Sequence, residues 1–152
     1  MTNAYAIRAL EADDVDLFRE LLAVMGRAFE ELDTYTRAQP DTAYLRRLLG
    51  RNNFMALAAF EGSAVIGGLA AYVLDKFEQA RSEIFIYDLA VDAAHRRKGV
   101  ATALIEAVKA IAAKRGAHVI FIQADPVDAP AVALYSKFGV RENVFHFDLP
   151  VD

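Results

Sequence analysis

The sequence contains no cysteine and no apolar stretch long enough for a membrane helix. Without cysteine the chain has no disulfide, no thiolate metal ligand and no cysteine nucleophile, which is consistent with a reducing compartment. The longest apolar run, Ala64 to Leu74, is too short to span a bilayer as a helix, and we interpret it as a buried strand. The first residues carry charges where a secretory signal needs an apolar core. We therefore expect a cytoplasmic protein without an export signal and without membrane insertion.

Histidine is also scarce. His95, His118 and His146 are far apart, and none of them stands in a pattern such as H-E-x-x-H. The chain likewise lacks the G-x-S-x-G elbow that presents a nucleophilic serine. The sequence therefore predicts no metal site, and it favours a direct reaction over one that passes through a covalent enzyme intermediate.

The composition is that of a soluble globular domain. The 152 residues are 55% hydrophobic and 25% charged, which is enough to bury a core within one domain spanning 1–152. The net charge of −4 argues against a general nucleic-acid binder, because such proteins carry a basic surface. An acidic balance suits a cationic small-molecule substrate, although it is also an ordinary contribution to solubility.

Hydrophobic periodicity predicts a mixed α/β fold in the order β-α-α-β-β-β-α-β-α-β. Amphipathic spacing indicates helices, and β-branched or aromatic runs indicate strands. The expected helices are 13–32, 42–49, 99–115 and 130–138, and the expected strands are 5–10, two within 54–74 joined at Glu61 and Gly62, 83–91, 118–124 and 143–149. Three consecutive strands followed by alternation indicate a mixed sheet with helices on its faces.

The stretch HRRKGVATAL, from His95 to Leu104, combines basic side chains, a glycine and a helix start. The first amides of a helix lack internal partners and attract anions, and Gly99 has no side chain to keep a phosphate away from the backbone. The stretch lacks the G-K-[ST] of a Walker loop and the three glycines of a dinucleotide fingerprint. We interpret it as a pyrophosphate cradle; the alternative is a solvated basic turn.

This stretch also resembles a known family. Arg96 to Ala101 matches the Q/R-x-x-G-x-G/A signature of the GCN5-related N-acetyltransferases (GNAT), and it stands between a strand and a helix as it does there. The resemblance implies the GNAT acyl-CoA N-acyltransferase fold, with acetyl-coenzyme A (acetyl-CoA) as co-substrate. The coenzyme-binding residues that it implies are Leu89, Ala90, Val91, Arg96, Arg97, Lys98, Gly99, Val100, Ala101 and Thr102.

A narrower resemblance covers nearly the whole chain. The segments YVLDKFEQARSEIFIYDLAV, QAD and AVALYSKFGVRENVFHFDL resemble the aminoglycoside 3-N-acetyltransferases of the gentamicin and fortimicin resistance type. This implies acetyl transfer to the 3-amino group of an aminoglycoside antibiotic. The alternatives are a transferase for a polyamine or protein amine, and a coenzyme A sensor without turnover. Asp88 and Tyr135 favour an enzyme, because a sensor needs neither.

Two side chains are candidates for the chemistry. Asp88 interrupts the apolar strand IFIYDLAV, where a carboxylate is costly unless it is paired or used. The resemblance favours Asp88 as the base for the amine; the alternative is a carboxylate at a bulge, bonded to backbone amides. Tyr135 matches the tyrosine that many GNAT members direct at the coenzyme sulfur, where it protonates or hydrogen-bonds the thiolate. Its alternative role is packing over the core.

A polycationic acceptor calls for an open site lined with carboxylates. We expect two or three members of a set in loops or at strand edges to face the substrate, and this set is Glu78, Glu83, Asp125, Asp128 and Glu142. Tyr35 lies in the expected loop after the first helix, which often shapes the acceptor site in this superfamily. The last expected strand, NVFHFDL, could pair across a homodimer, a frequent arrangement in the superfamily.

Overall fold

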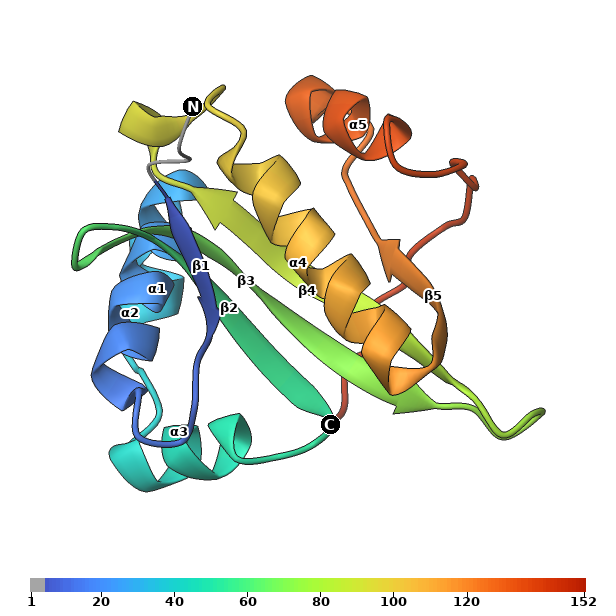
Figure 1. Cartoon of the computed structure of the whole chain (residues 1–152), viewed down its shortest axis with the longest axis horizontal. Helices are drawn as coiled ribbons and strands as arrows, with labels where there is room; N and C mark the ends of the chain where they lie inside the picture. The colour runs from blue at the N-terminus through green and yellow to red at the C-terminus, as the bar shows by residue number, and fades with distance from the viewer. Residues whose placement is uncertain (1–4) are drawn as a thin grey trace.

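A five-stranded mixed sheet forms the centre of the molecule in the computed structural model, which describes residues 5–152 (Figure 1). The strands lie in the order β1-β2-β3-β4-β5; neighbours from β1 to β4 are antiparallel, and β5 runs parallel to β4. Their bounds are β1 Ala6–Ala9, β2 Phe54–Glu61, β3 Ala64–Asp75, β4 Ser82–Val91 and β5 Ala117–Ile122. The helices are α1 Val15–Ala28, α2 Leu32–Thr36, α3 Thr42–Leu49, α4 Val100–Arg115 and α5 Ala129–Ser136, with a 3₁₀ turn at Ala93–His95.

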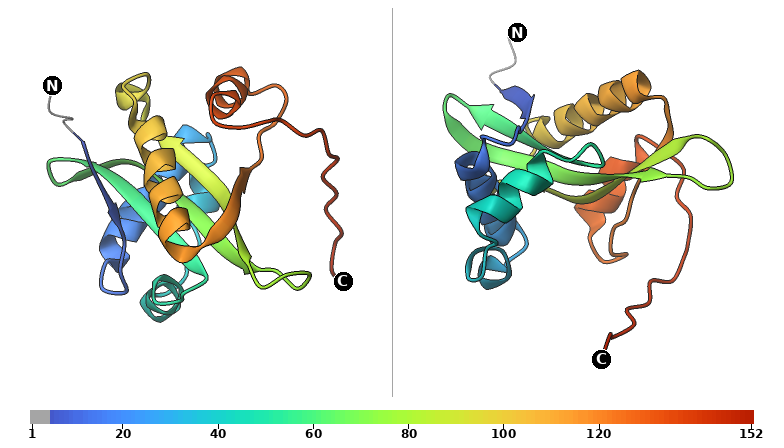
Figure 2. Two further views of the ribbon diagram at one scale, coloured as in Figure 1. Left: turned by 45° about the vertical axis from the view of Figure 1, so that its right-hand side comes forward. Right: turned by 90° about the horizontal axis from the view of Figure 1, so that it is seen from below.

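Helices cover both faces of the sheet, so the domain has two apolar cores (Figures 1 and 2). On one face α1 and α3 bury Leu21 and Leu45 against alternate residues of β2. On the other face α4 buries Leu104 and Val108 against β3 and β4. Because the central strands are buried on both faces, their sequences are continuously apolar and do not alternate between apolar and polar residues. The predicted mixed α/β class is confirmed.

Gly68 allows α1 to lie directly on β3. A Cβ at this position would clash with the Leu57 carbonyl of β2 and would approach Leu21 Cδ1 to 2.5 Å, so a side chain here would disturb both the neighbouring strand and the packing of α1. Leu21 is completely buried in that contact. The close packing matters for the site described below, because α1 leads directly into α2.

Strand β4 has a bulge and a free edge at its carboxyl end. Ala70 faces Asp88 and Ala71 faces Ile86, so Tyr87 is an extra residue in the ladder with β3. The pairing of β4 with β5 covers only its first half, up to Ile86. From Tyr87 to Val91 the edge that faces away from β3 therefore has no strand partner among residues 5–152.

Two elements differ from the prediction. The segment after α1, expected as a loop, forms the short helix α2. The predicted last strand, 143–149, is wrong for the single chain: residues 140–152 are assigned to no strand and leave the body of the domain (Figure 2). An alternating sequence favours an extended backbone, but a strand also needs a neighbour for its amides and carbonyls. Among the described residues of one chain this segment has none.

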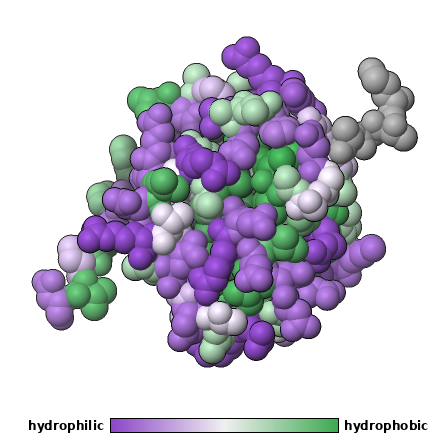
Figure 3. Space-filling view, turned by 90° about the vertical axis from the view of Figure 1, so that its left-hand side faces the viewer, coloured by the Kyte–Doolittle hydropathy of each residue, from purple (hydrophilic) through white to green (hydrophobic). Residues whose placement is uncertain are grey.

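Hydrophilic residues cover most of the face shown in Figure 3, with hydrophobic residues in small interrupted areas. Among residues 5–152, every helix is too short or too polar to cross a membrane. Over the same range, His, Asp and Glu side chains form no group of three placed to hold a metal ion.

Candidate active site

Asp88 and Tyr35 meet at the bulge of β4. The Tyr35 hydroxyl donates a hydrogen bond of 2.9 Å to Asp88 Oδ2, and both side chains are half-buried. Tyr35 comes from α2, which the packing of α1 holds over this part of the sheet. The carboxylate therefore bonds to a tyrosine hydroxyl, which differs from the alternative of backbone amides that the sequence left open.

The surroundings of Asp88 make it a stronger base than a free aspartate. Burial is the main cause that raises the pKa of Asp88, and the negative charge of Glu31 raises it further. The hydrogen bond from Tyr35 opposes them, because it stabilises the ionised form. Burial and the bond to Asp88 also raise the pKa of Tyr35, so this hydroxyl keeps its proton and stays a donor.

A pocket of about 230 Å³ opens beside this pair. Its walls are apolar side chains of α1 and α3, and its polar groups are one carboxylate and four tyrosine hydroxyls. The polar members are Asp88, Tyr35, Tyr44, Tyr72 and Tyr87. A few polar groups among apolar walls are typical of a small-molecule site.

The predicted cradle forms the amino end of α4. Gly99 precedes the helix with a φ of 82°, and Arg97 also has a positive φ, of 61°. The first backbone hydrogen bond of α4 runs from the Ala103 amide to the Gly99 carbonyl. No described side chain caps the helix. The amides of Val100 and the two residues after it therefore lack a partner within the helix.

The space beside Gly99 is open, because a Cβ built there would meet no described atom within 4 Å. The Arg96 side chain turns back and donates from Nε to the Val91 carbonyl at 3.2 Å, which holds the loop against the end of β4. Arg97 and Lys98 are exposed at the same turn. Free amides, basic side chains and open space fit a pyrophosphate group.

Tyr135 lies on α5, which follows β5 beyond its carboxyl end (Figure 1). Burial, followed by the charges of Asp128 and Asp88, raises the pKa of Tyr135 to about 12. The contribution from Asp88 means that the two predicted catalytic groups lie within electrostatic reach of each other. Asp128 also caps α5 by accepting a hydrogen bond of 3.2 Å from the Ala131 amide.

The predicted acidic residues are dispersed. Glu78 and Glu83 belong to the β3–β4 hairpin, where Lys76 lies 3.8 Å from the first and 3.5 Å from the second. His118 Nε2 lies 3.3 Å from Glu83. Asp125 is exposed in the loop after β5, and Glu142 is exposed in the segment 140–152. The structure thus brings only Asp128 of this set near Tyr135.

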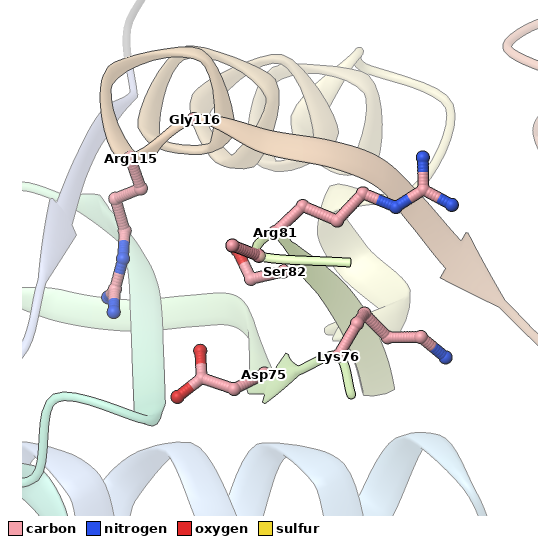
Figure 4. Close-up of a pocket in the computed structure, with 7 residues that line it drawn as sticks. Asp75, Lys76, Arg81, Ser82, Arg115 and Gly116 are labelled. Atoms are coloured by element: carbon pink, nitrogen blue, oxygen red, sulfur yellow. The ribbon is translucent and has the colours of Figure 1, made fainter. Parts of the chain in front are cut away.

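A second hollow, of about 340 Å³, lies at the hairpin end of the sheet. Figure 4 shows that Arg115 approaches it from the end of α4, while Lys76 and Arg81 come from the hairpin. It is larger than the pocket at Asp88, and two of its basic side chains, Lys76 and Arg81, form ion pairs with Glu78 or Glu83 beside it. It contains none of the groups predicted for chemistry.

Sequence reasoning did not identify Glu31, Tyr44, Tyr72 or Tyr87 as site residues. They come from α3, β3, β4 and the residue before α2, and no motif joins them. Only Tyr87 had a local signal, since it immediately precedes Asp88 in the interrupted strand. The others meet because the helices pack over one face of the sheet.

Comparison with known proteins finds solved structures that resemble this chain over nearly its whole length. One crystal structure, of an aminoglycoside acetyltransferase from an uncultured soil metagenomic sample, is 57% identical over 97% of this chain and 99% of its own, with a TM-score of 0.96. Another soil metagenomic aminoglycoside acetyltransferase, in complex with sisomicin, is 31% identical over 99% and 98% of the two chains, with a TM-score of 0.92.

A human protein, N-acetyltransferase 8, is 28% identical over 78 residues, which cover 51% of this chain and only 34% of the human protein. The profile of the Acetyltransferase (GNAT) family matches residues 18–140. The predicted superfamily and the GNAT-type fold are therefore confirmed, and this chain belongs to the GNAT family of acetyltransferases.

Proposed function

We propose that this protein transfers the acetyl group of acetyl-CoA directly to the 3-amino group of an aminoglycoside, an activity that confers antibiotic resistance. The observation that carries the proposal is the Tyr35–Asp88 pair, at the junction of the tyrosine-lined pocket and the free edge of β4. The likeness to two aminoglycoside acetyltransferases, one of them in complex with sisomicin, supports the substrate class. The narrower family resemblance supports the 3-amino position.

Asp88 acts on the acceptor. An aminoglycoside amine is mostly protonated at neutral pH and must lose a proton before its nitrogen can attack. The raised pKa of Asp88 suits it to take that proton, while Tyr35 orients the carboxylate. Glu31 adds a second negative charge that favours the ammonium form as the substrate arrives.

The coenzyme has a continuous path along the end of β4 and into α4. When bound, acetyl-CoA supplies the activated acetyl group as a thioester. The free edge at Leu89, Ala90 and Val91 offers backbone groups to the pantetheine arm, in the manner of an added strand. The amides of Val100, Ala101 and Thr102 hold the pyrophosphate, with charge from Arg97 and Lys98.

Tyr135 acts on the leaving sulfur. The new N–C bond forms as the C–S bond breaks, and the sulfur departs with the electron pair. With its pKa raised to about 12, Tyr135 is a weaker acid than an ordinary thiol at about 8.5, so full transfer of its proton is unfavourable. Tyr135 therefore stabilises the thiolate chiefly by donating a hydrogen bond. Asp88 takes the first proton of the ammonium group before attack, and solvent accepts the second proton, which the nitrogen loses once the N–C bond has formed. Solvent also supplies the proton that the departing sulfur finally carries.

The predicted acidic residues have unequal support as acceptor contacts. Asp128 has the most, because its charge acts on Tyr135. Asp125 and Glu142 are exposed and free to approach a polycation. Glu78 and Glu83 have the least, because lysine and histidine already face them at the other end of β4. We further propose a cytoplasmic location and a homodimer, which the lack of cysteine and the unpaired last segment support respectively.

A thiol-release assay with acetyl-CoA against gentamicin, kanamycin, spermidine and a lysine peptide tests the proposal. We expect release with an aminoglycoside at a kcat/KM well above that for the other amines. Product NMR then locates the acetyl group on the 3-amine. A preference for spermidine or the peptide contradicts the substrate class, acetyl on another nitrogen contradicts the position, and no release with any amine contradicts the activity.

A further inference from the structure

The pocket at Asp88 is too small to enclose a whole aminoglycoside. Its volume is about 230 Å³, whereas sites that enclose a drug-sized ligand have about 300–1,000 Å³. An aminoglycoside consists of several linked rings, so the pocket has room for only part of it. When the ring that carries the reacting amine lies beside Asp88, the other rings must lie at the mouth of the pocket or beyond it. The surface around the mouth therefore contributes to the choice of acceptor.

The bulge in β4 presents two consecutive side chains to this pocket. Neighbouring residues of a regular strand point to opposite faces, but Tyr87 is the extra residue of the bulge, and both Tyr87 and Asp88 line the pocket. Tyr87 is 62% exposed, so much of its side chain is open to solvent. The bulge thus places an accessible aromatic ring directly beside the proposed base.

Tyr87 belongs to a row of aromatic rings that crosses three neighbouring strands, β3, β4 and β5 (Figure 1). Tyr72 on β3 meets Tyr87 edge to face, with 6.0 Å between the ring centroids, and Phe85 on β4 lies 5.4 Å from Tyr87. Phe85 stacks in turn on Phe121 of β5 at 4.6 Å. Because these contacts hold the rings in place, the row offers a preformed surface, which reduces the entropy cost of binding a ligand.

The chemistry of this row suits an aminosugar ring. The faces of aromatic rings are electron-rich and attract ammonium groups and the C–H bonds on the flat side of a sugar. Burial is the main cause that raises the pKa of Tyr72, and the charge of Asp88 contributes, so the row lies within the field of the proposed base. A cationic ring is attracted by both, whereas a linear polyamine has no flat side with which to stack.

We propose that Tyr87, supported by Phe85, is a stacking platform for a second ring of the acceptor while another ring holds its amine at Asp88. The proposal rests on the proposed function and adds to it a residue that determines specificity. Tyr87 contributes binding energy and takes no part in the proton transfers. It makes the enzyme favour acceptors with a second aminosugar ring over a single aminocyclitol ring or a linear polyamine.

Equilibrium binding in the presence of coenzyme A tests the platform. The two probes are gentamicin, which has several rings, and 2-deoxystreptamine, the single ring that carries the 3-amine; calorimetry measures the first and ligand NMR the second. We expect Tyr87→Leu to raise the Kd for gentamicin by about tenfold and that for 2-deoxystreptamine by less than about twofold. Tyr87→Phe restores the ring and should recover most of the loss.

The matched control is Phe77→Leu, the same loss of an aromatic ring at a 96% exposed position in the β3–β4 hairpin, and it should leave both Kd values unchanged. Circular dichroism checks that all variants are folded. Equal losses for both probes in Tyr87→Leu, or unchanged gentamicin binding, overturn the platform. A loss in Tyr87→Phe as large as in Tyr87→Leu assigns the effect to the hydroxyl and overturns stacking.

The same samples separate this proposal from the proposed function, because binding is measured without turnover. A wild type that releases thiol with gentamicin while the platform variants bind as it does overturns the platform alone. A wild type that binds gentamicin through Tyr87 but releases no thiol supports the platform and contradicts the proposed function. A wild type that binds no gentamicin overturns both.

Discussion

The two ends of β4 both carry carboxylates, but their surroundings are opposite. At the hairpin end, Glu83 lies 3.5 Å from Lys76 and close to His118. At the pocket end, Asp88 forms no salt bridge with any described residue, and its contacts are the Tyr35 hydroxyl and the charge of Glu31. A paired carboxylate has its charge satisfied, whereas a half-buried carboxylate without a cation costs stability and is free to meet a cationic ligand.

The two hollows support the same distinction. The hollow at the hairpin has about 340 Å³ and the pocket at Asp88 about 230 Å³, so volume alone favours the end without the predicted catalytic groups. The larger hollow is lined by Lys76, Arg81 and Arg115, which repel a polycation. The smaller one combines apolar walls with a carboxylate, Asp88, that forms no salt bridge with any described residue. Charge and hydrogen bonding, not size, separate a candidate catalytic site from a surface depression.

The most direct test of this difference is to neutralise one carboxylate at the Asp88 pocket and one at the hairpin hollow. We expect Asp88→Asn to lower kcat/KM for the aminoglycoside by about 10²–10⁴-fold at neutral pH, the usual contribution of a general base. Activity should recover partly as pH rises, because more of the amine is then already neutral. The control Asp75→Asn, at the hairpin hollow, should change activity less than about twofold, within the range of an ordinary surface substitution. A pH–rate profile of Asp88→Asn that overlays the wild type excludes Asp88 from the chemistry.

A second test compares the proposed pyrophosphate cradle at the start of α4 with another glycine turn. Gly99→Glu places bulk and negative charge where the pyrophosphate meets the backbone, and we expect coenzyme affinity to fall by about 100-fold, or about 2.7 kcal/mol. Gly62→Glu is a matched control, because Gly62 has a φ of 61° and an equally open surrounding. Titration calorimetry with coenzyme A measures both. Equal affinities in two folded variants would remove the cradle from the coenzyme site.

Tyr135→Phe removes one hydroxyl and little volume, and we expect turnover to fall by about tenfold, the upper range for one hydrogen bond. The KM for the aminoglycoside should change little, because the hydroxyl is needed only as the sulfur departs. Steady-state kinetics at saturating coenzyme measure the two constants separately. Unchanged kcat assigns Tyr135 to packing alone.

The smallest expected effect is that of Tyr35→Phe. The hydrogen bond from Tyr35 lowers the pKa of Asp88, so its loss should raise that pKa further. A base with a higher pKa is ionised only at higher pH, and the acid limb of the kcat/KM profile should therefore move to higher pH. At neutral pH we expect a two- to tenfold loss, about the equivalent of one net hydrogen bond. A lower rate without displacement of the acid limb means that Tyr35 serves only to shape the pocket.

Local sequence was sufficient for most elements and for the cradle. Helix α3 begins after Asp41, which accepts a hydrogen bond of 2.8 Å from the Tyr44 amide, and it ends at Gly50, as the capping signals predict. The cradle is also local, since its glycine, basic residues and helix amides are contiguous. Asp88 could be noticed because a charge within an apolar strand is conspicuous in sequence.

The remaining features depend on residues that are distant in sequence. Tyr35 and Asp88 are 53 positions apart, and they meet only because Gly68 lets α1 pack close to the sheet and carry α2 over the bulge. Glu83 and Lys76 likewise lie 3.5 Å apart only because the β3–β4 hairpin brings them together.

The sequence by itself therefore determined most of the elements, the helix start with its glycine and basic residues, and the carboxylate within an apolar strand, because each depends on neighbours within a few positions. Only the tertiary structure decided that Asp88 is held by a tyrosine, that the tyrosines form one pocket and that the last segment has no strand partner among residues 5–152. The physical reason is that hydrogen bonds and burial depend on which surfaces meet, and helix packing and strand pairing bring together residues that no local pattern connects.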